Sequence, residues 1–127
     1  MALSEDNVRL KAVNHVTYNV RDKELAARFW EEVLGVKRIP KQVDSDHIIW
    51  LQIPSGAMVH LIETSDGPSI PSHHGAFEVD DIEAELKRLE GLGAEVLEGP
   101  IKTATGLSIA FIQAPDDVRI EVMQLPH

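Results

Sequence analysis

The sequence of 127 residues contains no cysteine, which excludes disulfide bonds, cysteine-based zinc sites and thiol nucleophiles. It is also poor in positive charge, with 12 Lys and Arg against 21 Asp and Glu and a formal net charge of −9. This deficit argues against a nucleic-acid groove and against an anionic membrane surface as the partner. Its longest uncharged apolar runs, such as Met58–Ile62 with its interruption at His60, fall far short of the roughly 18 residues that a membrane span requires.

No basic segment followed by an apolar stretch opens the chain, so we expect no secretion signal and a cytoplasmic location. Apolar residue types make up 43% of the sequence and charged types 26%, which is typical of a globular protein. We expect one domain over residues 10–127, preceded by a polar N-terminal arm at 1–9. Without cysteine, any bound metal ion must be held by histidines and carboxylates.

The first half of the chain predicts a strand, a helix and three further strands. Alternating residues favour a strand over Lys11–Val20, and Asp22 can cap a helix that Gly35 ends. Three short strands follow, over Val36–Gln42, His47–Ile53 and Ala57–Glu63. The segment Thr64–Ser72, rich in Gly and Pro, is typical of a linker.

The second half repeats this order. His74–Val79 is predicted to be a strand, and Asp80 with Glu83 resembles the capping box of a helix. An apolar stripe at helical spacing leads to Gly93, where we expect the helix to end. Three strands are then predicted, over Ala94–Glu98, Leu107–Gln113 and Val118–Gln124.

The two halves match residue by residue at nearly constant offsets. His15 and His74 are 59 residues apart, and His60 and Glu121 are 61 apart. One βαβββ unit therefore occurs twice, as a first module at 10–66 and a second at 67–127. A unit of about sixty residues buries little core alone, so the modules must pack together or against another subunit. We predict an α+β fold of two tandem modules and expect a homodimer.

Strand periodicity assigns each strand an apolar face and a mixed face. The mixed faces carry three imidazoles and one carboxylate, namely His15, His60, His74 and Glu121, at two pairs of equivalent positions. These four could converge on one divalent ion such as Zn, Ni, Fe or Mn. In the alternative interpretation, each is a hydrogen-bonded polar residue on a solvated strand face.

The same faces offer candidate substrate contacts. Trp50 and Phe111 are 61 residues apart and, with Met58 and Met123, could form an apolar wall for a small molecule, or could equally fill the core. Arg119 shares its predicted face with Glu121 and could contact a substrate. We expect it to form a salt bridge with Glu78 from the same face.

These residues resemble the vicinal-oxygen-chelate superfamily, which includes glyoxalase I, extradiol dioxygenases, methylmalonyl-CoA epimerase and the fosfomycin- and bleomycin-resistance proteins. The matching segments are Asn14–Asp22, Phe29-Trp30 and Leu34-Gly35 in the first half, and His74–Asp81 and Arg119–Val122 in the second. The resemblance covers about Lys11 to Gln124. It implies paired βαβββ modules whose mixed sheets curl around a metal-holding cavity, and many relatives are dimers.

The resemblance also implies a ligand set. Carried over, the metal ligands are His15, His60, His74 and Glu121, and Glu121 is the candidate base; glyoxalase I has a Glu where this chain has His60. The implied activity is glyoxalase-like isomerase or lyase chemistry on vicinal oxygens of a small substrate. His15, His74 and Glu121 alone would suit an iron-dependent extradiol-type dioxygenase. A non-catalytic binder of the bleomycin-resistance type is the third possibility, although those proteins lack the metal ligands.

Overall fold

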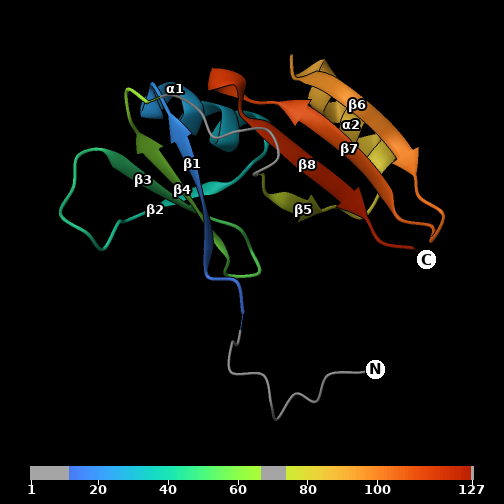
Figure 1. The fold of residues 1–127 in the computed structure, drawn as a ribbon, viewed down its shortest axis with the longest axis horizontal. Helices are drawn as coiled ribbons and strands as arrows, with labels where there is room; N and C mark the ends of the chain where they lie inside the picture. The colour runs from blue at the N-terminus through green and yellow to red at the C-terminus, as the bar shows by residue number, and fades with distance from the viewer. Residues whose placement is uncertain (1–11, 67–73, 127) are drawn as a thin grey trace, which may run out of the picture.

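The computed structural model describes residues 12–66 and 74–126, which form two four-stranded sheets with two helices (Figure 1). The elements of the first module are β1 (His15–Val20), α1 (Lys23–Arg28), the π-helical turn η2 (Phe29–Val33), β2 (Lys37–Ile39), β3 (Ile48–Gln52) and β4 (Met58–Glu63). Those of the second are β5 (Ala76–Glu78), α2 (Ile82–Gly91), β6 (Glu95–Lys102), β7 (Ser108–Gln113), the 3₁₀ turn η3 (Pro115–Asp117) and β8 (Arg119–Gln124).

The two sheets have the same topology. Their strand orders are β1-β4-β3-β2 and β5-β8-β7-β6, with the first strand of each module parallel to its last and the remaining pairs antiparallel. This confirms the predicted α+β fold of two βαβββ units. The sheets lie side by side and do not close into a barrel (Figure 1).

Both helices begin at an aspartate. The Asp22 side chain accepts a hydrogen bond from the Leu25 amide at 3.0 Å, as predicted. The cap of α2 is Asp81, whose side chain accepts from the Ala84 amide at 3.1 Å, so the assignment to Asp80 is wrong by one residue. The buried stripe of α2 starts at Ile82, and the cap must directly precede the first helical residue.

Several strands differ in length from their prediction. β2 and β5 have three residues each, whereas β6 continues through Gly99 and Pro100 to Lys102. Gly and Pro usually end a strand, but an edge strand such as β6 tolerates them. The pairing of β6 with β7 shifts its register twice along this stretch. The predicted arm at 1–9 and most of the linker at 64–72 lie outside the described residues.

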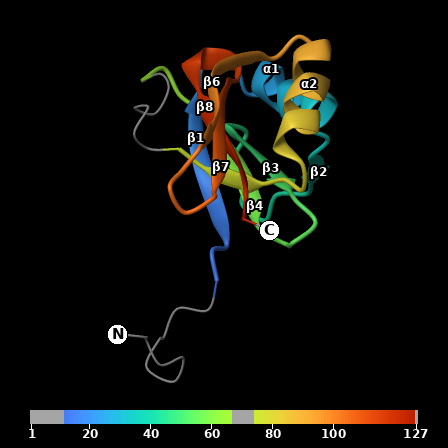
Figure 2. The same ribbon diagram turned by 90° about the vertical axis from the view of Figure 1, so that its right-hand side faces the viewer.

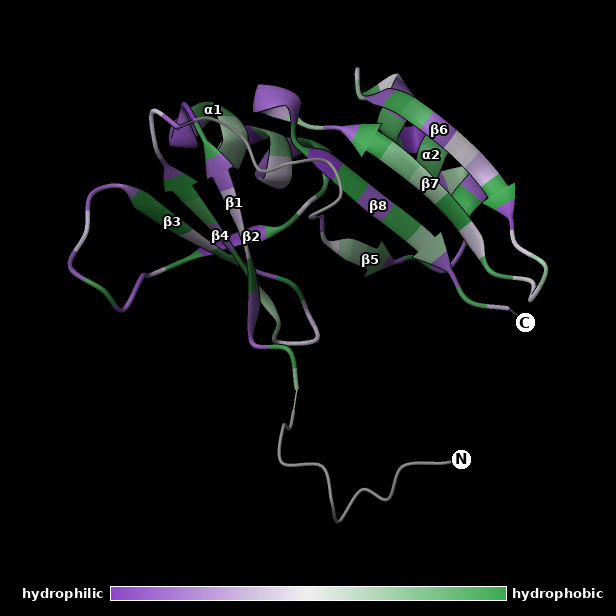
Figure 3. Ribbon diagram, viewed as in Figure 1, coloured by the Kyte–Doolittle hydropathy of each residue, from purple (hydrophilic) through white to green (hydrophobic). Residues whose placement is uncertain are grey.

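The strands β3, β7 and β8 have one buried and one less buried face, as their alternation predicts. Figure 3 shows that hydropathy alternates along β8, where Ile120 and Val122 are buried and Glu121 between them is half-buried. In β4, Val59 and Leu61 point to the core. Figure 2 shows α2 against one face of the second sheet, and residues of β8 that point to the other face, such as Glu121, are half-buried.

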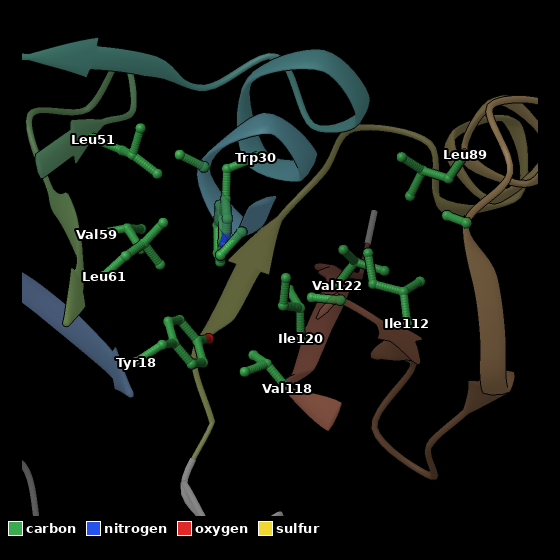
Figure 4. Close-up of a cluster of buried hydrophobic side chains, with 14 of the residues drawn as sticks. Tyr18, Trp30, Leu51, Val59, Leu61, Leu89, Ile112, Val118, Ile120 and Val122 are labelled. Atoms are coloured by element: carbon green, nitrogen blue, oxygen red, sulfur yellow. The ribbon is translucent and has the colours of Figure 1, made fainter. Parts of the chain in front are cut away.

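A single apolar core joins the two modules. Figure 4 shows side chains from both, with Trp30 between the Leu51 side of the first sheet and strand β5. The indole of Trp30 is 2% exposed and packs against Tyr18 and Phe77, at ring-centroid distances of 5.6 and 5.5 Å. Because Phe77 belongs to the second module, this contact couples the modules through the core.

A buried hydrogen bond also crosses from one module to the other. The Tyr18 hydroxyl accepts from the Gly75 amide at 2.7 Å. A Cβ added at Gly75 would lie 2.6 Å from that hydroxyl oxygen, so only glycine allows this close approach.

Burial raises the pKa of Tyr18 to about 12, from an ordinary value of 10.0. In the unfolded chain the phenol ionises near pH 10, so folding binds the proton more tightly and the folded state loses stability as the pH rises from 10 toward 12. We expect this loss to reach about 2–3 kcal/mol, at 1.36 kcal/mol per pKa unit. Because Tyr18 is the single tyrosine, its titration can be followed by tyrosinate absorbance.

The control for this prediction is Tyr18→Phe, which removes the ionisable group and keeps the ring. Comparing urea unfolding of the two proteins across this alkaline range isolates the tyrosine from the lysines, which titrate in both. A tyrosinate midpoint near 10 in the folded protein contradicts the prediction.

No helix within 12–66 or 74–126 is long and apolar enough to cross a membrane.

Candidate metal centre

The open face of the first sheet carries three stacked rings. His60 pairs in register with Thr17 on β1 and with Trp50 on β3, so these side chains lie side by side on one face. The His60 ring is stacked on Trp50 at 4.3 Å and on His15 at 4.0 Å, with interplanar angles of 10° and 14°. Met58 pairs with His15 on the same face. The structure thus groups four predicted site residues.

The two histidines of this face differ in environment. His15 is exposed, and its Nδ1 donates to Asn14 Oδ1 at 2.8 Å, which leaves the lone pair on Nε2. His60 is 6% exposed, and its buried Nε2 finds no hydrogen-bond partner in the part of the chain that is described. Burial lowers the pKa of His60, and the neighbouring His15 lowers it further, which favours the neutral, metal-binding form.

The open face of the second sheet brings His74 and Glu121 together. His74 Nε2 donates to Glu121 Oε1 at 2.9 Å. The His74 ring meets Phe111 edge-on at 5.2 Å, and Phe111 pairs in register with Glu121. Met123 lies two residues beyond Glu121 on the same face.

Arg119 contacts the same ring but not the predicted partner. Its guanidinium lies 4.3 Å from the centre of Phe111, and its Nη2 is 3.4 Å from Glu98 Oε2. The predicted pairing with Glu78 is therefore wrong. The reason is the length of β6, which places Glu98 opposite Phe111, whereas Glu78 is beside Met123. Nothing in the sequence indicates Glu98 as the partner of Arg119. Asn14 as the hydrogen-bond partner of His15 is indicated by its place directly before His15 in the chain.

The four predicted ligands form two separate pairs in the chain. Among residues 12–66 and 74–126, no three His, Asp or Glu side chains are grouped closely enough to hold one ion. His15 and His60 lie on the first sheet, whereas Glu121 lies on β8 of the second sheet and His74 two residues before β5. The four-ligand centre stays a prediction, because the described part of one chain does not bring the four residues together.

A cavity of about 420 Å³ lies elsewhere, on the core side between the modules. Its wall includes Trp30, Phe77 and Leu89, and none of the four predicted ligands contributes to it. The candidate ligands are instead on the two faces away from the core. Each of these faces also carries half-buried apolar side chains, namely Trp50, Met58, Phe111 and Met123.

The donor chemistry of both pairs fits a divalent ion. Two neighbouring ligands on an octahedral ion, with bonds of about 2.0–2.2 Å at right angles, are about 3 Å apart. The 2.9 Å between His74 Nε2 and Glu121 Oε1 matches this separation. On the first sheet, the hydrogen bond from His15 to Asn14 fixes the tautomer in the way that outer partners of metal-bound histidines do.

A family model described as the Glyoxalase/Bleomycin resistance protein/Dioxygenase superfamily matches residues 12–122. The chain belongs to this superfamily, which confirms the resemblance seen in the sequence.

Three proteins illustrate what the chain is similar to. The uncharacterized protein YwbC of Bacillus subtilis is 32% identical, over 90% of this chain and 98% of that protein. An ethylmalonyl-CoA/methylmalonyl-CoA epimerase of Cereibacter sphaeroides is 30% identical, over 82% of this chain and 89% of the epimerase. The structure of TnmS3, an antibiotic binding protein from Streptomyces sp. CB03234, aligns with a TM-score of 0.71 and 30% identity, over 95% of this chain and all of that one.

Proposed function

We propose that this protein is a metal-dependent, glyoxalase-like enzyme that moves a proton next to the vicinal oxygens of a small substrate. The observation that carries the proposal is the pair His74–Glu121, set at ligand spacing on an open sheet face, with His15 presenting a free Nε2 on the equivalent face. The similarity to an epimerase supports it, because epimerisation is itself the removal and return of a proton.

We further propose that a homodimer completes the centre. One module supplies two donors, whereas a catalytic ion needs at least three protein ligands. In a twofold dimer, the first-sheet face of one subunit can meet the second-sheet face of its partner, which creates two equal sites. The half-buried apolar side chains on both faces would be covered by the same contact.

When bound, a divalent ion such as Zn, Ni, Fe or Mn supplies Lewis-acid polarisation of the substrate oxygens. Glu121 is the residue that takes the proton: with Oε1 on the side of His74 and the ion, its second oxygen, Oε2, is left for the substrate C–H. The electron pair of that bond is delocalised onto the adjacent carbonyl oxygen until Glu121 returns the proton. Phe111, Trp50 and the two methionines form the apolar wall that limits water, and Arg119 lies at its edge.

A second candidate is a binding protein without catalysis, which the similarity to the antibiotic-binding TnmS3 favours. The exposed His15 ring, at the end of its stack with His60 and Trp50, would then offer a flat surface for an aromatic ligand. A dioxygenase is the third candidate, since two histidines and one carboxylate are the ligands of non-haem iron oxygenases.

Elemental analysis of the purified protein, after growth with added Zn, Ni, Fe and Mn, separates these candidates. We expect about one ion per chain in the wild type and in His47→Ala, a variant of an exposed histidine away from the site, and none in Glu121→Gln. Exchange of substrate C–H hydrogen with deuterated water, followed by NMR, tests the proton transfer. Absence of metal from the wild type contradicts the proposal, and oxygen uptake with catechols favours the dioxygenase instead.

A further inference from the structure

The His60 ring is enclosed between two other rings. β1, β4 and β3 are neighbours in the sheet, and His15, His60 and Trp50 stack across them in that order. The contacts are nearly parallel, with centroid distances of 4.0 and 4.3 Å. Two buried nitrogens, His60 Nε2 and Trp50 Nε1, have no hydrogen-bond partner among the described residues. Packing rather than hydrogen bonding therefore holds this stack together.

Stacked imidazoles cannot share one ion. An imidazole nitrogen binds a metal through a lone pair in the plane of its ring, at about 2.0–2.1 Å. The planes of His15 and His60 are within 14° of parallel and the centroids are 4.0 Å apart, so an ion in the plane of one ring lies well outside the plane of the other. In this arrangement, one of the two histidines can be a ligand and the other cannot.

The surroundings of the two rings favour His15, rather than His60, as the metal ligand. Its ring is exposed, and the hydrogen bond from Nδ1 to Asn14 Oδ1 orients it with Nε2 free. His60 is 6% exposed, and its Nε2 is covered. An ion arriving from solvent reaches His15 without any rearrangement, whereas binding to His60 requires that the stack open.

We propose that Trp50 is a positioning residue that holds His60 out of metal coordination, so that the ion is bound by His15, His74 and Glu121 only. This inference rests on the proposed function and revises the predicted role of His60 within it. Three protein ligands leave more positions for substrate oxygens than four do. The histidine at position 60 is then a stacked wall residue of the site.

Zn²⁺ binding to single-site variants tests this assignment. Loss of an outer partner of a metal ligand costs about 10–100-fold in affinity, so we expect His15→Ala to weaken Zn²⁺ binding by more than about 100-fold. We expect His60→Ala to stay within about tenfold of the wild type, close to the His47→Ala control. Equal losses in His15→Ala and His60→Ala overturn the inference while leaving the proposed function intact. A wild type that binds no Zn²⁺ overturns both.

Substitution of Trp50 tests the positioning role directly. Trp50→Leu removes the stacking surface, so His60 is free to turn toward the ion and Zn²⁺ binding is expected to tighten. The gain should vanish in the double variant Trp50→Leu/His60→Ala, and Trp50→Phe, which keeps a stacking ring, should behave as the wild type. Unchanged or weaker binding in Trp50→Leu contradicts the inference.

NMR supplies a readout that does not depend on affinity. A proton above an aromatic ring is shifted upfield, so the carbon-bound protons of His60 should be upfield in the metal-free protein and less so in Trp50→Leu, where only the His15 ring remains stacked on His60. We expect the upfield shift to persist when Zn²⁺ is added to the wild type. Its loss on metal binding would show that the stack opens and that His60 becomes a ligand.

Discussion

A dimer of two differently inactivated subunits is expected to regain metal binding that neither subunit has alone. One subunit carries His15→Ala/His60→Ala and the other His74→Ala/Glu121→Gln, so each lacks one of the two pairs. If the pairs meet across a twofold dimer, the mixed dimer has one intact site and one site with no ligands. Its metal content should be about half that of the wild type, because one of two sites survives.

Co-expression with two different affinity tags, followed by purification on both, isolates the mixed dimer for elemental analysis. Each double variant purified alone is the control and should contain no metal. A mixed dimer without metal contradicts the shared centre. A wild-type mass near the 14.1 kDa of one chain, across micromolar concentrations, contradicts the dimer itself.

Trp30→Ala is expected to lower the free energy of unfolding by about 3–5 kcal/mol, the usual cost of removing a large buried aromatic side chain. Trp30 is 2% exposed, and its ring lies against Tyr18 of the first module and Phe77 of the second. Its loss leaves a void where the modules meet, which the rigid strands on either side cannot fill. Urea unfolding measures the effect.

The matched control is Leu25→Ala in α1, the helix that runs into η2. Leu25 is 48% exposed, so we expect its loss to change stability by no more than about 0.5 kcal/mol. Trp30→Phe retains an aromatic ring and should fall between the two. A loss below about 1 kcal/mol in Trp30→Ala would mean that the modules are coupled elsewhere.

Much of the fold could be predicted because it depends on local patterns. Alternation along β4 and β8 fixed which face of each strand is buried, and the offset of 61 residues between His60 and Glu121 indicated that the modules are equivalent. The cap of α2 was misplaced because two adjacent aspartates both suit the role. The length of β6 was missed because Gly99 and Pro100 are strand-ending residues that an edge strand tolerates.

The candidate site was predictable in its residues and not in its assembly. Periodicity places His15 and His60 on one face, and it says nothing of whether their rings converge or stack. Nor does it determine how one sheet is oriented relative to the other, because that depends on core packing around Trp30. The prediction that Arg119 pairs with Glu78 is wrong for a similar reason. The register between β6 and β7 places Glu98 within reach of Arg119, and the sequence pattern does not reveal that register.

The parallel pairing of the first strand with the last has a consequence for synthesis on the ribosome. β1 has no partner within its sheet until β4 emerges, since His15 pairs with Met58. Such a distant pairing delays closure of the first module, because the intervening chain must be ordered before the contact forms. Even then, the Tyr18 hydroxyl and the Trp30 ring lack their contacts with Gly75 and Phe77. The nascent first module is thus expected to expose this apolar surface until β5 has left the exit tunnel.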